Sequence, residues 1–90
     1  MRQDQARALA QYILDLSYGL DHTHRAEDRP VYEDHLADAA VLLALLVSDA
    51  KSHAVAEAVK GHEHLMGWSW LEDPICQKSA ESWHRFKALL

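Results

Sequence analysis

The segment from Ala39 to Val47 constrains the fold of this chain more than any other feature. All nine of its residues are apolar, so in a helix its apolar surface extends around the whole cylinder. Each Å² of apolar surface left in water forgoes roughly 25 cal/mol of stabilisation. We therefore expect this segment either at the centre of a helical bundle or at the contact between two copies of the chain.

The same segment belongs to a longer periodic pattern that is typical of a helix-packing seam. Its apolar positions alternate four and three residues apart: Leu36, Ala40, Leu43, Val47, Ala50 and Ala54. Pro30 suits the first turn of such a helix, and Gly61 suits its end. Ser48 and Asp49 could each cap a new helix, which makes a break near Ser48 the alternative. The unbroken spacing favours one helix from residue 30 to residue 60.

Two further amphipathic helices are predicted. The first covers about residues 3 to 19, ends at Gly19 and carries one apolar stripe, Leu9, Ile13, Leu16 and Leu20. Its opposite side is expected to be polar and includes Arg7, Gln11 and Asp15. The second begins at Asp73-Pro74, which resembles an N-cap followed by a first-turn proline. Its apolar stripe contains Cys76, Ala80, Trp83 and Leu90.

These patterns predict an all-α fold. No segment shows sustained two-residue alternation, and 90 residues are too few to give two self-sufficient cores. We expect one domain over residues 1–90, a small antiparallel bundle of three to four helices with a long apolar central helix. The all-round apolarity of that helix favours a dimer or higher oligomer.

The charge distribution points to a protein partner. A net charge of −5 argues against binding to the nucleic-acid backbone, which requires clustered Lys and Arg. Seven acidic residues between Asp15 and Asp38 face only two arginines, so this stretch carries most of the negative field. We expect an acidic surface that attracts a basic protein partner, with the candidate residues Asp21, Asp28, Glu33, Asp34 and Asp38.

A tryptophan-containing segment offers a second candidate surface. Trp68 and Trp70 are adjacent to Leu65, Met66 and Leu71. Tryptophan is enriched at the energetic centres of interfaces because it buries a large area and keeps a polar N–H. The segment is interpreted either as a packed connector or as an apolar patch that binds a partner.

Two histidine doublets suggest an alternative function. His22 and His24, and likewise His62 and His64, are two residues apart. In extended backbone this spacing directs both imidazoles to one side, whereas in a helix they point about 200° apart. A break near Ser48 would return the second doublet towards the first, and a continuous helix would require an antiparallel dimer. The four histidines could then bind zinc or another divalent transition metal, while the simpler interpretation is solvated or helix-capping histidines.

Catalytic patterns are weaker. Asp34, His35 and Asp38 lie within one helical turn and suggest the polar centre of a helical-bundle enzyme. Arg29 and His35 resemble the short signature of the HEPN family of all-helical ribonucleases, which implies a metal-independent, dimeric nuclease. A nucleophilic Cys76–His84 pair is excluded if that helix forms, because eight residues span about 12 Å.

We therefore predict a small acidic interaction protein, such as a regulator, adaptor or inhibitor, rather than an enzyme. The single cysteine suits a reducing compartment, and the longest apolar run is nine residues, against the roughly 20 needed to cross a bilayer. The predicted location is the cytoplasm, with no direct contact to membrane or nucleic acid. No cofactor is expected unless the histidines bind metal.

Overall fold

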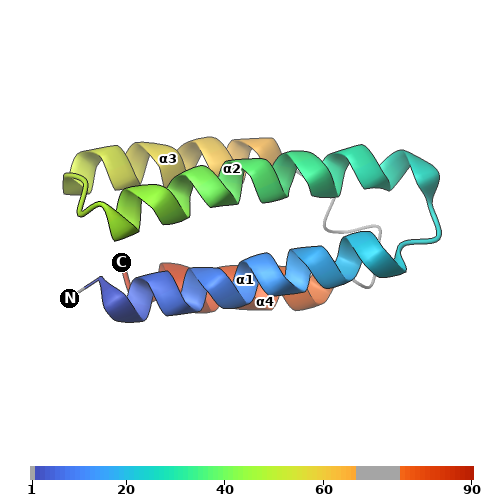
Figure 1. Ribbon diagram of the computed structural model, residues 1–90, viewed down its shortest axis with the longest axis horizontal. Helices are drawn as coiled ribbons and strands as arrows, with labels where there is room; N and C mark the ends of the chain where they lie inside the picture. The colour runs from blue at the N-terminus through green and yellow to red at the C-terminus, as the bar shows by residue number, and fades with distance from the viewer. Residues whose placement is uncertain (1, 67–75) are drawn as a thin grey trace.

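The computed structural model describes residues 2–66 and 76–90, and the regular structure in these residues is entirely helical (Figure 1). The elements in chain order are α1 (Gln3–His22), a short 3-10 helix η1 (Ala26–Asp28), α2 (Arg29–Val47), α3 (Ser52–Met66) and α4 (Cys76–Lys87). The four α-helices run along the long axis of a molecule that measures 38 × 19 × 18 Å. The predicted all-α class and antiparallel bundle are confirmed. The predicted start of the last helix at Asp73-Pro74 lies outside the described residues.

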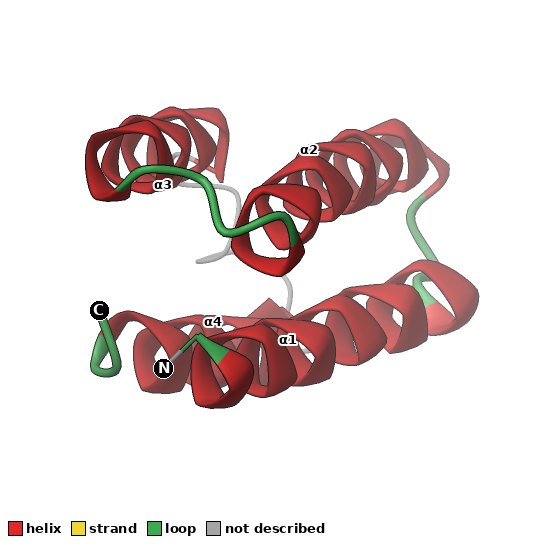
Figure 2. Cartoon of the chain, turned by 60° about the vertical axis from the view of Figure 1, so that its left-hand side comes forward, coloured by secondary structure: helices red, strands yellow, loops and turns green. Residues whose placement is uncertain are grey.

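The bundle has two layers. Helix α1 packs against both α2 and α4, and α2 also packs against α3. Figure 2 shows α2 and α3 as one layer above α1 and α4, with both chain ends at the same end of the bundle. None of the helices in the described part of the chain combines the length and the apolar character needed to span a bilayer.

The core draws side chains from all four helices. Its buried apolar residues are Leu9, Tyr12, Leu16, Tyr32, Ala39, Leu42, Leu46, Val55, Val59, Trp83 and Phe86. Trp83 lies at the aromatic centre, with its ring centroid 5.0 Å from that of Tyr12 and 5.3 Å from that of Phe86. Gly19 does not end α1 as predicted, because the helix continues to His22. A Cβ at Gly19 would lie 2.6 Å from the ring of Tyr32, so glycine permits the close approach of α1 and α2.

The predicted continuous helix from residue 30 to residue 60 is wrong, because α2 ends at Val47 and α3 begins at Ser52. The hydrogen bonds at the end of α2 are those of a C-terminal cap in which one residue after the helix takes the left-handed backbone conformation. The N–H of Ala50 donates to the carbonyl of Leu45 at 3.0 Å, and the N–H of Asp49 donates to the carbonyl of Leu46 at 3.3 Å. Asp49 has the left-handed backbone conformation, with φ of 59°. This turn folds α3 back onto α2, which buries apolar residues that a single rod would leave uncovered.

The inward side of α2 is also displaced by one residue from the predicted seam. Its buried residues are Tyr32, His35, Ala39, Leu42 and Leu46, which likewise alternate three and four apart. Ala40 and Val47, both in the predicted seam, are exposed instead. Since the segment is apolar on every side, more than one stripe could face the core. Asp15 of α1 is a second correction, because it is buried rather than on a polar outer side.

Candidate functional site

The outward side of α2 is apolar and exposed. We define the α2 apolar face as the exposed residues Ala37, Ala40, Val41, Ala44 and Val47. Val41 is 60% exposed and Val47 is 74% exposed. Leu36 and Leu43, which are half-buried, pack against the core beside this face. The chain has no charged residue between Asp38 and Asp49.

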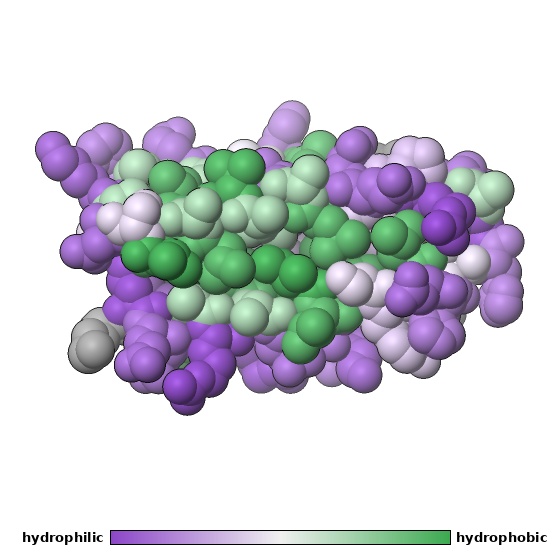
Figure 3. Space-filling view, in the orientation of Figure 1, coloured by the Kyte–Doolittle hydropathy of each residue, from purple (hydrophilic) through white to green (hydrophobic). Residues whose placement is uncertain are grey.

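The apolar surface continues from α2 onto α1. Figure 3 shows a continuous hydrophobic area across these two helices, bordered by hydrophilic residues. Leu14 of α1 is 62% exposed, although large aliphatic side chains of folded proteins are usually buried. A contiguous apolar area with a polar border is typical of a protein–protein contact.

The outer side of α3 provides a contrast within the same layer. Its exposed residues include His53, Glu57, Lys60 and His64, which are all polar or ionisable. This is the ordinary composition of a solvent-facing helix side. The apolar outer side of α2 is therefore not a general property of this bundle.

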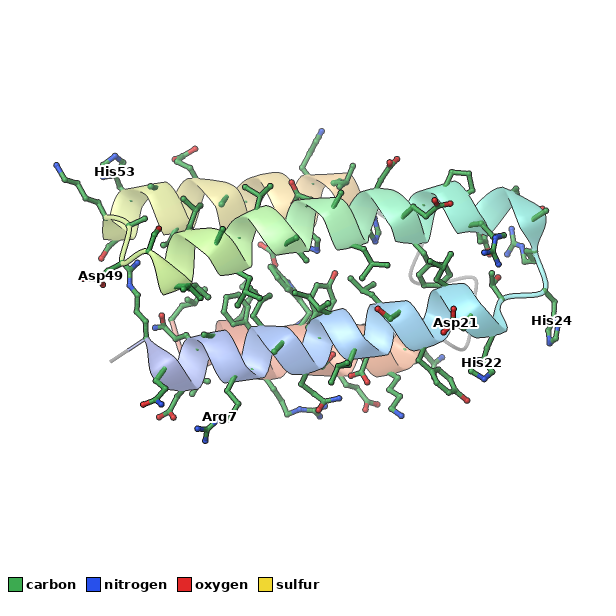
Figure 4. All side chains as sticks on the ribbon, viewed as in Figure 1. Arg7, Asp21, His22, His24, Asp49 and His53 are labelled. Carbon is green, nitrogen blue, oxygen red and sulfur yellow. The ribbon has the colours of Figure 1, made fainter. Side chains whose placement is uncertain are left out.

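The two ends of the α1–α2 side carry different charges. Asp21, Glu33 and Asp34 are exposed near the connection from α1 to α2. Arg7 and Lys51 are exposed towards the opposite end, where the acidic Asp4 and Asp49 are also exposed. Figure 4 shows Asp21 and Arg7 towards opposite ends of α1. The apolar area thus lies between an acidic end and a more basic end.

The structure separates the predicted acidic site residues into two groups. Asp21, Glu33 and Asp34 are exposed and available to a partner. Asp28 is half-buried, with its carboxylate 3.3 Å from Nε of Arg25. Asp38 is half-exposed and hydrogen-bonded to His62, as described next. Trp68 and Trp70 lie outside the described residues.

A polar cluster joins three helices, and we name it by its members Tyr12, Asp38 and His62. Tyr12 and His62 are buried, whereas the side chain of Asp38 is 41% exposed. Nε2 of His62 is 2.5 Å from the hydroxyl of Tyr12, and Nδ1 of His62 is 2.6 Å from Oδ2 of Asp38. In a neutral imidazole, Nδ1–H donates to Asp38 and Nε2 accepts from Tyr12. Burial lowers the pKa of His62, and this effect outweighs the opposing influence of Asp38. The pKa shift therefore agrees with the neutral form.

Additional polar side chains surround this cluster. The rings of His35 and His62 are 5.7 Å apart, and Nε2 of His35 is 3.4 Å from the carbonyl oxygen of Leu65. Burial lowers the pKa of His35, and the neighbouring His62 lowers it further. Glu63 accepts hydrogen bonds from Nε1 of Trp83 at 3.1 Å and from Nζ of Lys87 at 2.8 Å. The side chains of Tyr12 and His62 are fully buried, so only the half-exposed carboxylate of Asp38 connects the cluster with the surface.

The structure does not bring the histidine doublets together as ligands. His62 points inward and His64 outward, as helical geometry dictates for a two-residue spacing. Both ring nitrogens of His62 are already hydrogen-bonded, and Nδ1 of His22 is 2.9 Å from the carbonyl of Tyr18. His24 is exposed beyond the end of α1 (Figure 4). Within residues 2–66 and 76–90, no group of three or more His, Cys, Asp or Glu residues is arranged to hold a metal ion.

The structure also does not bring the proposed catalytic residues together in one exposed site. Asp34 is exposed, His35 is buried, and Asp38 is bonded to His62. Arg29 donates from Nη1 to the carbonyl of Leu20 at 3.2 Å. The arginine and histidine that resemble the HEPN signature therefore do not form an exposed pair. Comparison of the chain with protein-family models, curated proteins and solved structures gave no match.

Proposed function

We propose that this chain is a small helical interaction protein that docks another protein chain on its α2 apolar face. The observation that carries the proposal is the exposure of Val41 and Val47 within the part of α2 after Asp38, which has no charged residue. A monomer gains nothing from such a surface, whereas an interface buries it at roughly 25 cal/mol per Å².

The acidic end adds specificity to this docking. Asp21, Glu33 and Asp34 are exposed beside the apolar area, so a partner that places basic side chains there is favoured over one that places acidic ones. Regulators, adaptors and inhibitors use such surfaces. A cytoplasmic setting belongs to the same proposal, because the single Cys76 suits a reducing compartment.

The test compares two alanines that are both exposed in helices. Ala40 lies on the α2 apolar face, and Ala56 lies on α3. We expect Ala40→Glu to lose protein binding and Ala56→Glu to retain it, because only the first places a carboxylate in the interface. Binding is measured by affinity capture from the native host and by light scattering of the purified chain. Thermal melts check that both variants fold.

The proposal is overturned if the folded Ala40→Glu protein behaves like the Ala56→Glu protein in both binding measurements. A loss of binding by both variants to the same extent also contradicts it, since the effect would then come from added charge in general.

A further inference from the structure

We infer that the occupant of the α2 apolar face is a second copy of this chain, packed antiparallel about a two-fold axis. The inference rests on the proposed function and goes further, because it names the partner and the arrangement. It depends on the spacing of exposed residues along α2, on the charges at the two ends, and on the area that an interface requires.

The exposed residues along α2 form a stripe with a symmetric spacing. Its members within α2 are Ala37, Ala40, Ala44 and Val47, all of them exposed. They are separated by three, four and three positions, which is the same sequence of spacings from either end. A two-fold axis perpendicular to α2, between Ala40 and Ala44, therefore places this stripe against its own copy.

That axis pairs residues whose numbers add to the same total. Ala40 lies opposite Ala44 of the partner subunit, and Ala37 lies opposite Val47 of the partner subunit. Small residues at the centre let the two helices approach closely, at an interaxial distance of about 8 Å. Val41 is adjacent in sequence to Ala40 and adds apolar contact beside the two-fold axis.

The charges select the antiparallel arrangement. Glu33 lies near the start of α2, one turn before this stripe, and an antiparallel copy brings that end towards the turn after Val47, where Lys51 of the partner subunit is exposed. At the level of the whole face, the acidic end of one copy is brought towards the end that carries Arg7 and Lys51 in the other. A two-fold axis along the helices would instead place the two acidic ends together, and like charges in contact disfavour that arrangement.

The area also fits a second copy. A standard stable interface buries roughly 800 Å² on each partner, about one-seventh of the 5634 Å² surface of this chain. An occupant must therefore cover much of one side of the bundle. A second copy presents an apolar side of matching length and composition, with its more basic end towards the acidic end of the first copy.

The first experiment measures mass by size-exclusion chromatography with light scattering over a dilution series. We expect twice the 10.2 kDa of one chain for the unmodified protein. Ala40→Glu should weaken the dimer roughly tenfold or more, because each subunit then places a carboxylate against the apolar Ala44 of the partner subunit. Ala56→Glu should leave the dimer unchanged.

The second experiment tests the antiparallel pairing by charge exchange. Glu33→Lys and Lys51→Glu should each weaken dimerisation by a few-fold, and the double variant should recover most of the loss, because opposite charges again face each other at each end of the interface. Both positions are exposed, so these variants fold even if Ala40→Glu does not. Circular dichroism melts provide the check.

Each outcome distinguishes this inference from the proposed function. A mass of one chain at every concentration up to roughly 100 µM overturns the second copy as the occupant. If Ala40→Glu then still loses capture of a different protein, the proposed function stands without the dimer. A dimer that Ala40→Glu does not weaken overturns the assignment of the α2 apolar face as the contact between the two copies. A double variant that dimerises more weakly than either single variant overturns the antiparallel arrangement.

Discussion

The two sides of α2 have similar composition and different surroundings. The inner side contributes Tyr32, Ala39, Leu42 and Leu46 to the core, and the outer side consists of the α2 apolar face. Only the inner side is covered by α1 and α3. The comparison shows that one helix can carry more apolar surface than the other three can bury. Hydrophobicity alone therefore does not identify the core side, and the surplus side is the candidate for binding.

The largest expected effect separates the two sides directly. Leu42→Ala removes a buried side chain and should lower the free energy of unfolding by about 2–5 kcal/mol. Val41→Ala, at the adjacent outward position, should lower it by less than about 0.5 kcal/mol. Urea denaturation in dilute solution measures both values for the isolated chain. Equal losses at the two positions would contradict the assignment of inner and outer sides.

The next effect concerns the polar cluster beneath the inner side. Tyr12→Phe removes the hydroxyl that bonds to Nε2 of His62 and leaves that buried nitrogen without its donor. We expect a loss of about 1–3 kcal/mol in the free energy of unfolding. Tyr18→Phe is the matched control, because Tyr18 is exposed and keeps its ring contacts with His22. A loss in the control as large as that of Tyr12→Phe would show that the buried hydrogen bond is not the cause.

Acidification should reduce the stability that the buried histidines on the inner side of the bundle contribute, without affecting the outer side of α2. Burial lowers the pKa of both His35 and His62 below the ordinary value of 6.5, so the unfolded chain binds more protons than the folded chain. Their contribution is fully present above pH 6.5 and is lost as the pH falls through the lowered pKa values. Asp34, Asp38 and Glu63 oppose these shifts without reversing them.

We therefore expect the free energy of unfolding to fall between pH 7 and pH 5, by up to about 1.4 kcal/mol per pH unit for each histidine. Replacement His35→Gln should make this fall shallower. The measurement is urea denaturation at a series of pH values. Stability that is constant or higher at pH 5 would contradict the neutral state of the buried histidines.

The smallest effect lies at the turn that creates the two sides. Asp49 occupies a left-handed conformation that glycine adopts without strain. Asp49→Gly should raise the free energy of unfolding by up to about 1 kcal/mol, and Asp49→Ala should lower it. The ion pair between Arg2 and Asp49 is long, at 3.8 Å, and the Asp49 side chain is mostly exposed, so its loss should matter little. A lower stability for the glycine variant than for the alanine variant would contradict this account.

Much of the fold could be predicted from the sequence, because helical periodicity is a local signal. The four-three spacing identified α1, and the proline at position 30 marked the start of α2. The break after Val47 was missed because the left-handed position is occupied by Asp49 rather than by glycine. The inward stripe of α2 was misplaced by one residue because nine apolar residues in succession offer no polar side as a reference.

The polar cluster could not be predicted in the same way. Tyr12 and His62 are 50 positions apart, and His62 and Asp38 are 24 apart, so no local spacing connects them. Only the fold brings these side chains together. The opposite orientations of His62 and His64, in contrast, follow directly from helical geometry once the segment is known to be a helix.

The bond between Asp38 and His62 also fixes how far α2 is turned about its own axis. Turning the helix by one residue, about 100°, would bring another apolar stripe inward at little hydrophobic cost. It would also carry Asp38 away and leave the buried N–H of His62 without an acceptor, at about 1–3 kcal/mol. One carboxylate at the edge of an apolar helix thus favours a single orientation of that helix about its axis over several others of similar hydrophobic energy. That orientation determines which hydrophobic side chains are exposed on the surface.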